Sequence, residues 1–149
     1  MDHAGWKYVP QGLTSAQLNW PYCIATWLLD GDCFVDQFTE KMVPDPARMK
    51  LSEIVEVHHD DPINQLGAKF RHKVRVEVFL NDGTRMERTI GSARSSEYKF
   101  AGEDDIVAKF EKLAAKALPK AQIEQLRDAM LGLDKLEDAT KIAQLLGKS

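Results

Sequence analysis

The chain has 149 residues, which is enough for one domain with a single hydrophobic core. Apolar residues make up 44% of the sequence and charged residues 29%, so wholesale disorder is excluded. The net charge is −3 and the basic residues do not gather into a stripe, which gives no electrostatic basis for binding nucleic acid. No apolar run approaches membrane-spanning length and the N-terminus lacks the pattern of a signal peptide, so we expect a soluble, cytoplasmic protein that does not bind a membrane.

The first strong prediction along the chain is an apolar helix over residues 20–29. Asn19 is a good N-cap because its side-chain oxygen accepts an unpaired backbone N–H, and Pro21 falls in the first turn, where proline is tolerated. Gly31 supplies a left-handed stop. Apolar residues surround this helix, so we expect it to be buried on nearly all sides, after a further helical turn at 15–18.

Short elements are predicted next in the chain. Asp45 is a plausible N-cap and Pro46 a plausible first residue of a short helix that ends near residue 51 or 52. The β-branched run at 54–58 predicts a strand, and residues 60–67 are typical of a turn.

The clearest β signal is the alternation in KFRHKVRVEVFL, residues 69–80, where valines and charged residues point in opposite directions. Asn81-Asp82-Gly83 predicts a tight turn, and residues 85–90 return along the first strand. The pattern therefore predicts an antiparallel hairpin at about 69–90 with one solvated face.

The C-terminal third predicts three helices over 104–147. Asp104 or Asp105 caps the first helix, and Pro119 ends it and begins the second. Apolar stripes on these helices mark the faces that turn inward.

These elements together predict an α+β fold. A small antiparallel sheet with the hairpin at about 69–90 packs on the buried helix at about 20–29, and a three-helix C-terminal segment follows. We expect a single domain over residues 1–149, with an α+β part at 1–100 and a helical tail at 104–147.

His58-His59-Asp60-Asp61 places four potential metal ligands in a row. Adjacent residues of a strand point to opposite faces, so the run does not easily close on one ion. A solvated strand end is the favoured interpretation, and we expect no metal site. Cys23 and Cys33 are too few for a disulfide scaffold and form no CxxC pair, so we expect two reduced thiols, one of them buried.

Tyr22 is the residue of most functional interest, because a phenol in the first turn of a buried helix needs a hydrogen-bond partner or an opening. One interpretation is a core tyrosine bonded to the backbone. The other is a phenol at the mouth of a pocket, near a helix N-terminus whose dipole favours carboxylates. Arg94 lies in a polar loop at 91–104 with anion-binding character, for which a solvated linker is the favoured alternative.

Three stretches carry a resemblance to a known family. They are KYVPQGLTSAQLNWPYCIATWLLDGDCFVDQF, then VPDPARMKLSEIVEV with KVRVEVFLNDGTRMER, and finally DDIVAKFEKLAAKALPKAQIEQLRDAMLGLDKLEDATKIAQLL. Their order resembles the MmgE/PrpD family, which includes 2-methylcitrate dehydratase, cis-aconitate decarboxylase and iminodisuccinate epimerase. The match is collinear over nearly the whole chain.

The resemblance implies a lyase or isomerase that removes a proton beside a carboxylate and needs no metal or organic cofactor. It places Tyr22 at the family's active-site-facing tyrosine, as a supporting catalytic residue, and we take Asn19 and Arg94 as candidate substrate-binding residues. Asn19 stands where the family usually has Ser, which keeps a helix cap but loses a hydroxyl. The loop after Gly91 does not reproduce the family's usual Gly-Asp-Pro.

The resemblance also concerns length. Family members are much longer, with a large helical domain ahead of the matched region that carries most of the acid–base groups, so this chain resembles the smaller α+β lid domain plus the closing helices. In the longer proteins the closing helices pack on that domain. We therefore expect the apolar stripes at 123–133 and 139–146 to be partly uncovered, and the chain to form a homodimer or to bind a separately encoded helical subunit.

Two functions remain open from the sequence. The first is the small subunit or truncated relative of a lyase or isomerase acting on di- or tricarboxylates, as 2-methylcitrate dehydratase does, without catalysis on its own. The alternative is a non-catalytic binding or regulatory module that pairs with a helical partner or with a full-length family enzyme. The residues of the chain do not decide whether it is an enzyme on its own.

Overall fold

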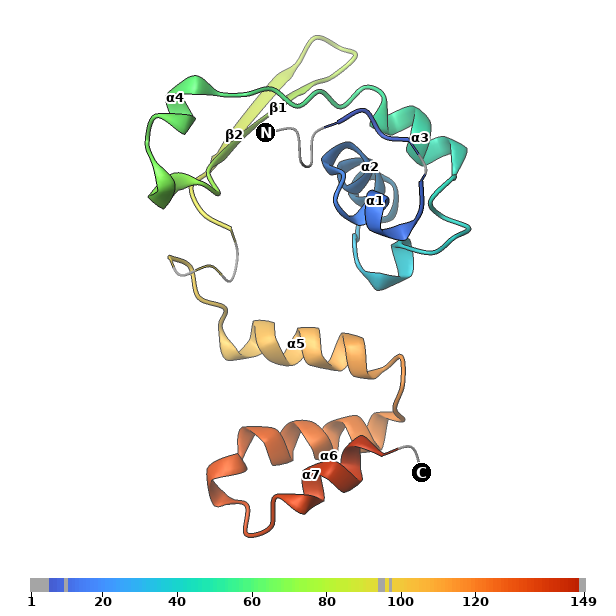
Figure 1. Cartoon of the computed structure of the whole chain (residues 1–149), viewed down its shortest axis with the longest axis vertical. Helices are drawn as coiled ribbons and strands as arrows, with labels where there is room; N and C mark the ends of the chain where they lie inside the picture. The colour runs from blue at the N-terminus through green and yellow to red at the C-terminus, as the bar shows by residue number, and fades with distance from the viewer. Residues whose placement is uncertain (1–5, 10, 94–95, 97, 148–149) are drawn as a thin grey trace. The chain divides into compact units, whose positions relative to one another are not determined.

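The computed structural model describes residues 6–9, 11–93, 96 and 98–147. The chain is an α+β protein with one two-stranded antiparallel sheet, and helices form its C-terminal end, which confirms the predicted class (Figure 1). It divides into two compact units, Met1–Ala68 and Lys69–Ser149, and each is described by itself. Within the described ranges, no helix has both the length and the apolar character needed to cross a membrane.

The first unit is built around one central helix. Its elements are α1 (Leu13–Gln17), α2 (Trp20–Asp30), the 3-10 turn η1 (Val35–Gln37), α3 (Pro46–Ser52) and α4 (Asp61–Asn64). The main contacts of α2 are with α1 and α3, which lie beside it in Figure 1.

Both ends of α2 form as the sequence predicts. The side-chain oxygen of Asn19 accepts the backbone N–H of Tyr22 at 2.9 Å, and Pro21 lies in the first turn. Gly31 ends the helix in the left-handed conformation, with φ of 67°, and its N–H donates to the carbonyl of Trp27.

Burial of α2 is one-sided. Pro21, Tyr22, Ala25 and Thr26 are buried, and this part of the prediction holds. The opposite stripe of large apolar side chains is exposed, and it comprises Trp20, Ile24, Trp27 and Leu28. The expectation of burial on nearly all sides is therefore wrong, because among the described residues α1 and α3 cover only one face of the helix.

The core of the first unit is small and aromatic. Tyr8, Ala16, Tyr22 and Val43 form its buried cluster, and Phe38 and Met49 pack against it. The unit is thus assembled from segments that precede, form and follow α2.

The strand predicted at residues 54–58 is wrong, because this segment is irregular. Ile54 is 74% exposed. A β-branched run becomes a strand only where another strand supplies the ladder, and here none pairs with it among the described residues. The turn-like segment that follows contains the short helix α4, which Asp60 caps by accepting the N–H of Ile63 at 3.1 Å.

The second unit begins with the 3-10 turn η2 (Ala68–Phe70), which straddles the boundary, and the predicted hairpin. Strands β1 (Val74–Phe79) and β2 (Arg85–Ile90) pair antiparallel, with Val74 opposite Ile90 and Phe79 opposite Arg85. Asp82 accepts the N–H of Thr84 at 2.8 Å in the connecting turn. The predicted packing of this hairpin on the 20–29 helix stays a prediction, as does the single domain.

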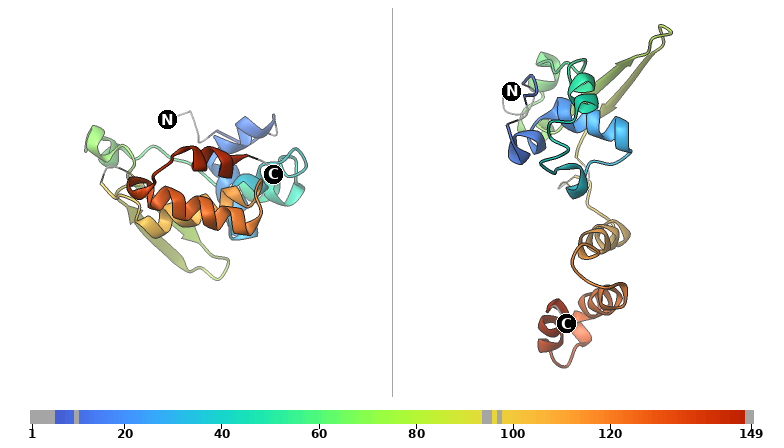
Figure 2. Two further views of the ribbon diagram at one scale, coloured as in Figure 1. Left: turned by 90° about the horizontal axis from the view of Figure 1, so that it is seen from below. Right: turned by 90° about the vertical axis from the view of Figure 1, so that its right-hand side faces the viewer.

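The C-terminal helices are α5 (Glu103–Ala114), α6 (Lys120–Leu131) and α7 (Thr140–Leu146), with the 3-10 turn η3 (Leu133–Lys135) before the last. Figure 2 shows α6 and α7 side by side, and the two helices are in contact. The N-cap of α5 is Gly102, so the prediction of Asp104 or Asp105 as the cap is wrong. Both aspartates lie in the first turn instead, where the positive end of the helix dipole stabilises their negative charges.

The apolar stripes of the C-terminal helices are covered unevenly. Ile123 and Leu126 of α6 are 6% and 2% exposed, so this half of the stripe is covered within the chain. Met130, Leu133 and Leu146 remain about half exposed or more. The expected uncovered surface therefore includes these distal positions, and Ala139 and Ala143 are exposed as well.

Candidate functional site

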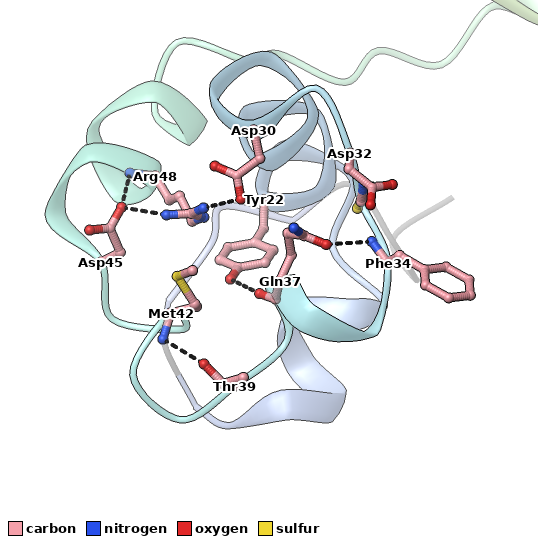
Figure 3. A network of polar contacts seen from close by, with 10 residues as sticks. Tyr22, Asp30, Asp32, Phe34, Gln37, Thr39, Met42, Asp45 and Arg48 are labelled. Carbon is pink, nitrogen blue, oxygen red and sulfur yellow. Dashed lines mark hydrogen bonds and ion pairs between the residues drawn. The ribbon is translucent and has the colours of Figure 1, made fainter. Parts of the chain in front are cut away.

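The polar groups of greatest interest lie on the buried face of α2 and on the segments that pack against it. Figure 3 shows Tyr22 and Asp30 of α2, Gln37 of η1, and Asp45 and Arg48 at the start of α3. All belong to the first unit.

Tyr22 is fully buried, and its hydroxyl donates to the backbone carbonyl of Gln37 at 3.1 Å (Figure 3). Its ring lies 4.7 Å from the ring of Tyr8 and 5.8 Å from that of Phe38. Burial raises the pKa of the phenol, although the Arg48 charge acts in the opposite direction. In this arrangement Tyr22 is a neutral hydrogen-bond donor whose partner is backbone.

Asn19 is also fully buried, and both ends of its amide are used within the protein. The oxygen caps α2, and the nitrogen donates to the carbonyl of Trp6 at 2.7 Å. The side chain therefore joins the segment before α1 to the start of α2. Its candidate role in binding substrate stays a prediction.

A charged cluster that the sequence analysis missed joins α2 to α3. The guanidinium of Arg48 forms ion pairs with Asp30 at the end of α2 and, at 2.9 Å, with the cap residue Asp45. The Arg48 side chain is 7% exposed, while the two carboxylates are 23% and 30% exposed. Burial alone lowers the pKa of Arg48, but the hydrogen bonds to Asp30 and Asp45 reverse this and hold the pKa above its ordinary value.

The pairing of Arg48 with Asp45 has a sequence signal, because an acidic cap at position i meets a cation at i+3 in the first turn. The pairing with Asp30 has none, because the two residues are 18 positions apart and only the packing of α3 on α2 brings them together.

Two buried polar atoms on this face have no hydrogen-bond partner among the described residues, Oγ1 of Thr26 and Nε of Arg48. An unpaired buried donor or acceptor costs about 1–3 kcal/mol, so both positions suit an ordered water. They belong to the interior of the unit and not to an open cleft.

The candidate anion-binding loop at 91–104 lies only partly within the described residues. Arg94 lies outside the described residues, so its candidate substrate-binding role stays a prediction. Tyr98 is 54% exposed, and the ammonium of Lys69 lies 5.6 Å from the centre of its ring.

The acidic and histidine-rich run makes local ion pairs. His58 pairs with Glu56 at 2.9 Å and His59 with Asp61 at 3.0 Å, all at the surface. Across the described ranges, no group of three or more His, Cys, Asp or Glu side chains could hold a metal ion.

A shallow cavity of about 310 Å³ opens in the first unit, where its described lining residues are Gly12, Leu13, Glu40, Val43 and Pro44. Glu40 is the charged member of that lining, and a carboxylate repels an anionic ligand. The cavity therefore does not fit a di- or tricarboxylate by itself.

Comparison with known proteins adds the family context. The family model of the MmgE/PrpD C-terminal domain matches residues 1–135. The chain is 26% identical over 149 residues to a cis-aconitate decarboxylase of Aspergillus terreus (strain NIH 2624 / FGSC A1156), a match that covers 97% of this chain and 30% of that protein. A second cis-aconitate decarboxylase of Aspergillus terreus is 27% identical over 154 residues, again covering 97% of this chain and 30% of the relative. The chain thus spans about a third of the length of these relatives, and it belongs to the MmgE/PrpD family through that family's C-terminal domain.

Proposed function

We propose that this chain is the tyrosine-bearing part of a lyase or isomerase acting on di- or tricarboxylates, and that a separate helical partner supplies the acid–base groups. The observation that carries the proposal is the match of nearly the whole chain to 30% of a cis-aconitate decarboxylase. The match covers 30% of that enzyme's length, and we assign the acid–base groups of the rest to the partner.

The internal bonding of the first unit supports the need for a partner. Arg48 is held by two carboxylates, and both ends of the Asn19 amide are used. Binding a polycarboxylate requires cationic or N–H donors aimed at an opening. The groups named here are instead committed to the fold.

Tyr22 is the residue we propose to contact the substrate. Its raised pKa keeps the phenol protonated, so it would act as a donor to a substrate carboxylate or to a developing negative charge. The bond from its hydroxyl to Gln37 is made to the backbone of a short 3-10 turn. Substrate contact would require this turn to move aside when the partner is bound.

The proposal is tested with a chimera in which this chain replaces the matching C-terminal part of the Aspergillus terreus cis-aconitate decarboxylase. We expect the isolated chain to release no carbon dioxide from cis-aconitate, and the chimera to release it. Release by the isolated chain would contradict the requirement for a partner. A chimera that folds, as judged by circular dichroism, but stays inactive would instead favour the non-catalytic binding module.

The chain offers a matched control for Tyr22. Tyr8 is also buried, and its hydroxyl donates to the carbonyl of Val43 at 2.9 Å, so Tyr8→Phe and Tyr22→Phe remove similar bonds. We expect Tyr22→Phe to lower turnover by the chimera about tenfold or more, since positioned proton donors contribute at least that much. Tyr8→Phe should leave turnover nearly unchanged, and equal losses would assign Tyr22 a structural role.

A further inference from the structure

The hairpin of the second unit is a two-stranded sheet, and among the described residues neither β1 nor β2 pairs with a third strand (Figure 1). A two-stranded hairpin is marginally stable at best in water, and an open strand edge is a template for a further strand. Val76 and Val78 of β1 are 43% and 41% exposed, so the apolar face of this hairpin is also largely in solvent. The hairpin is therefore a candidate docking surface.

The hydrogen bonds of the hairpin determine which backbone groups of β1 point outward. Next to the turn, the Leu80 N–H donates to the carbonyl of Thr84 at 2.9 Å. Backbone groups along an antiparallel strand point alternately toward and away from the neighbouring strand, so those of Val76 and Val78 point toward β2. The N–H and C=O of Glu77, which lies between them, therefore point away from β2.

The charged face of the hairpin contains an unfavourable pair. Glu77 of β1 lies directly opposite Glu87 of β2, and like charges in this position destabilise a sheet. Arg85 offsets the repulsion by pairing with Glu77 at 3.1 Å and with Glu87 at 3.0 Å. A second cation, placed opposite Glu77 across the outer edge of β1, would balance the charges further.

We propose that the outer edge of β1 pairs antiparallel with the same edge of a second copy of this chain, so that two hairpins form one four-stranded sheet. A twofold axis perpendicular to the sheet passes through Val76, which lies opposite its counterpart. Arg75 of each copy then lies opposite Glu77 of the other, and Val74 lies opposite Val78. The valines of the two copies form one continuous apolar row on the other face.

Charge complementarity selects this register and this strand. Moving the axis by one residue along β1 places Arg75 opposite Arg75 or Glu77 opposite Glu77. The equivalent pairings centred on the middle of β2 place Glu87 opposite Glu87 or Arg88 opposite Arg88. The register through Val76 avoids every such pair, and its outward backbone groups are those that the hairpin leaves pointing away from β2.

Sedimentation velocity at increasing protein concentration measures the dimer. Arg75→Glu and Glu77→Arg each place like charges opposite one another at two symmetric positions, so we expect each to weaken dimerisation about tenfold. The double variant restores both pairs with their signs exchanged and should dimerise as the wild type does. Arg88→Glu and Glu87→Arg make the same charge changes on β2, away from the proposed edge, and should leave dimerisation nearly unchanged. Circular dichroism of each variant excludes unfolding as the cause.

Residue-resolved hydrogen exchange locates the edge. Exchange of the Glu77 amide should slow as the protein concentration rises, because the second copy accepts its N–H. The Val78 amide, which already points toward β2, should slow much less. Cys23 and Cys33 are free and each partly exposed, so the expectation that one of them is buried is wrong. Dithiothreitol is therefore present throughout, so that disulfides between chains do not imitate the dimer.

Several results would overturn the proposal. One is a chain that stays monomeric at every concentration measured, and another is a dimer that neither β1 variant weakens, because such a dimer uses a different surface. Equal weakening by the β2 variants would assign the effect to overall charge, and a double variant as weak as the single ones would exclude the register. None of these readouts involves turnover, so they are independent of the proposed function.

Discussion

Arg48 of α3 forms an ion pair with Asp30, the last residue of α2, and this contact joins two helices whose paired residues are 18 positions apart. The Arg48 side chain is 7% exposed, so its guanidinium depends on its partners for the solvation that water would otherwise give. Asp45 supplies the second carboxylate from the N-terminus of α3. The pair fixes how α3 lies on α2.

Replacing Arg48 with Met is expected to destabilise the chain by about 2–3 kcal/mol. Loss of one partner of a buried pair typically costs about 3–5 kcal/mol, and the partial exposure of the two carboxylates reduces that loss. Urea denaturation followed by circular dichroism measures the change. Arg127→Met removes a surface ion pair with Glu111 and serves as the control, for which we expect a much smaller loss. Equal losses in the two variants would contradict a structural role specific to Arg48.

Asn19→Ala is expected to cost about 2 kcal/mol of stability, since it removes the cap of α2 and leaves the Trp6 carbonyl without its donor. Asn19→Ser keeps a cap oxygen but cannot replace the amide donor, so its loss should be about half as large. Chemical denaturation of the three proteins gives the ranking. If the serine and alanine variants are equally destabilised, the cap contributes little and the bond to Trp6 dominates.

The sequence predicts the elements whose signals are local. The ends of α2 follow from Asn19, Pro21 and Gly31, each within one turn of the residues that it affects, and the structure confirms all three. The hairpin follows from alternation and from the turn that contains Gly83, and the structure confirms that the two strands pair antiparallel.

Features that depend on distant partners are not predictable in this way. The run at 54–58 has the β-branched composition of a strand, but composition cannot supply the neighbouring strand that a ladder requires. The bonds from Tyr22 to Gln37 and from Arg48 to Asp30 likewise arise from packing across the unit. The sequence therefore identifies Tyr22 as notable but leaves open whether it is a core or a pocket residue.

Gly31→Ala is expected to destabilise the chain by about 1 kcal/mol, because a residue with a Cβ is strained at φ of 67°. The loss is one of backbone conformation alone, since a Cβ at this position would meet no atom within 4 Å. Gly31→Asn should lose less, because Asn tolerates the left-handed region. Gly91→Ala is the control, also with open space around the Cβ and without a positive φ, and its stability should be close to that of the wild type. Thermal unfolding of the four proteins tests the order.

Tyr8 should make the chain sensitive to alkaline pH. Burial raises its pKa from 10.0 to about 12, with the neighbouring Tyr22 adding to the shift, so the folded protein disfavours the tyrosinate that the unfolded chain forms freely. Because the folded pKa lies above the unfolded one, the contribution of Tyr8 is fully present below pH 10.0 and is lost as the pH rises toward about 12. Denaturation midpoints across this range should fall more steeply for the wild type than for Tyr8→Phe, which has no phenol to ionise at that position. Parallel curves for the two proteins would show that Tyr8 ionises as readily in the folded chain as in the unfolded one.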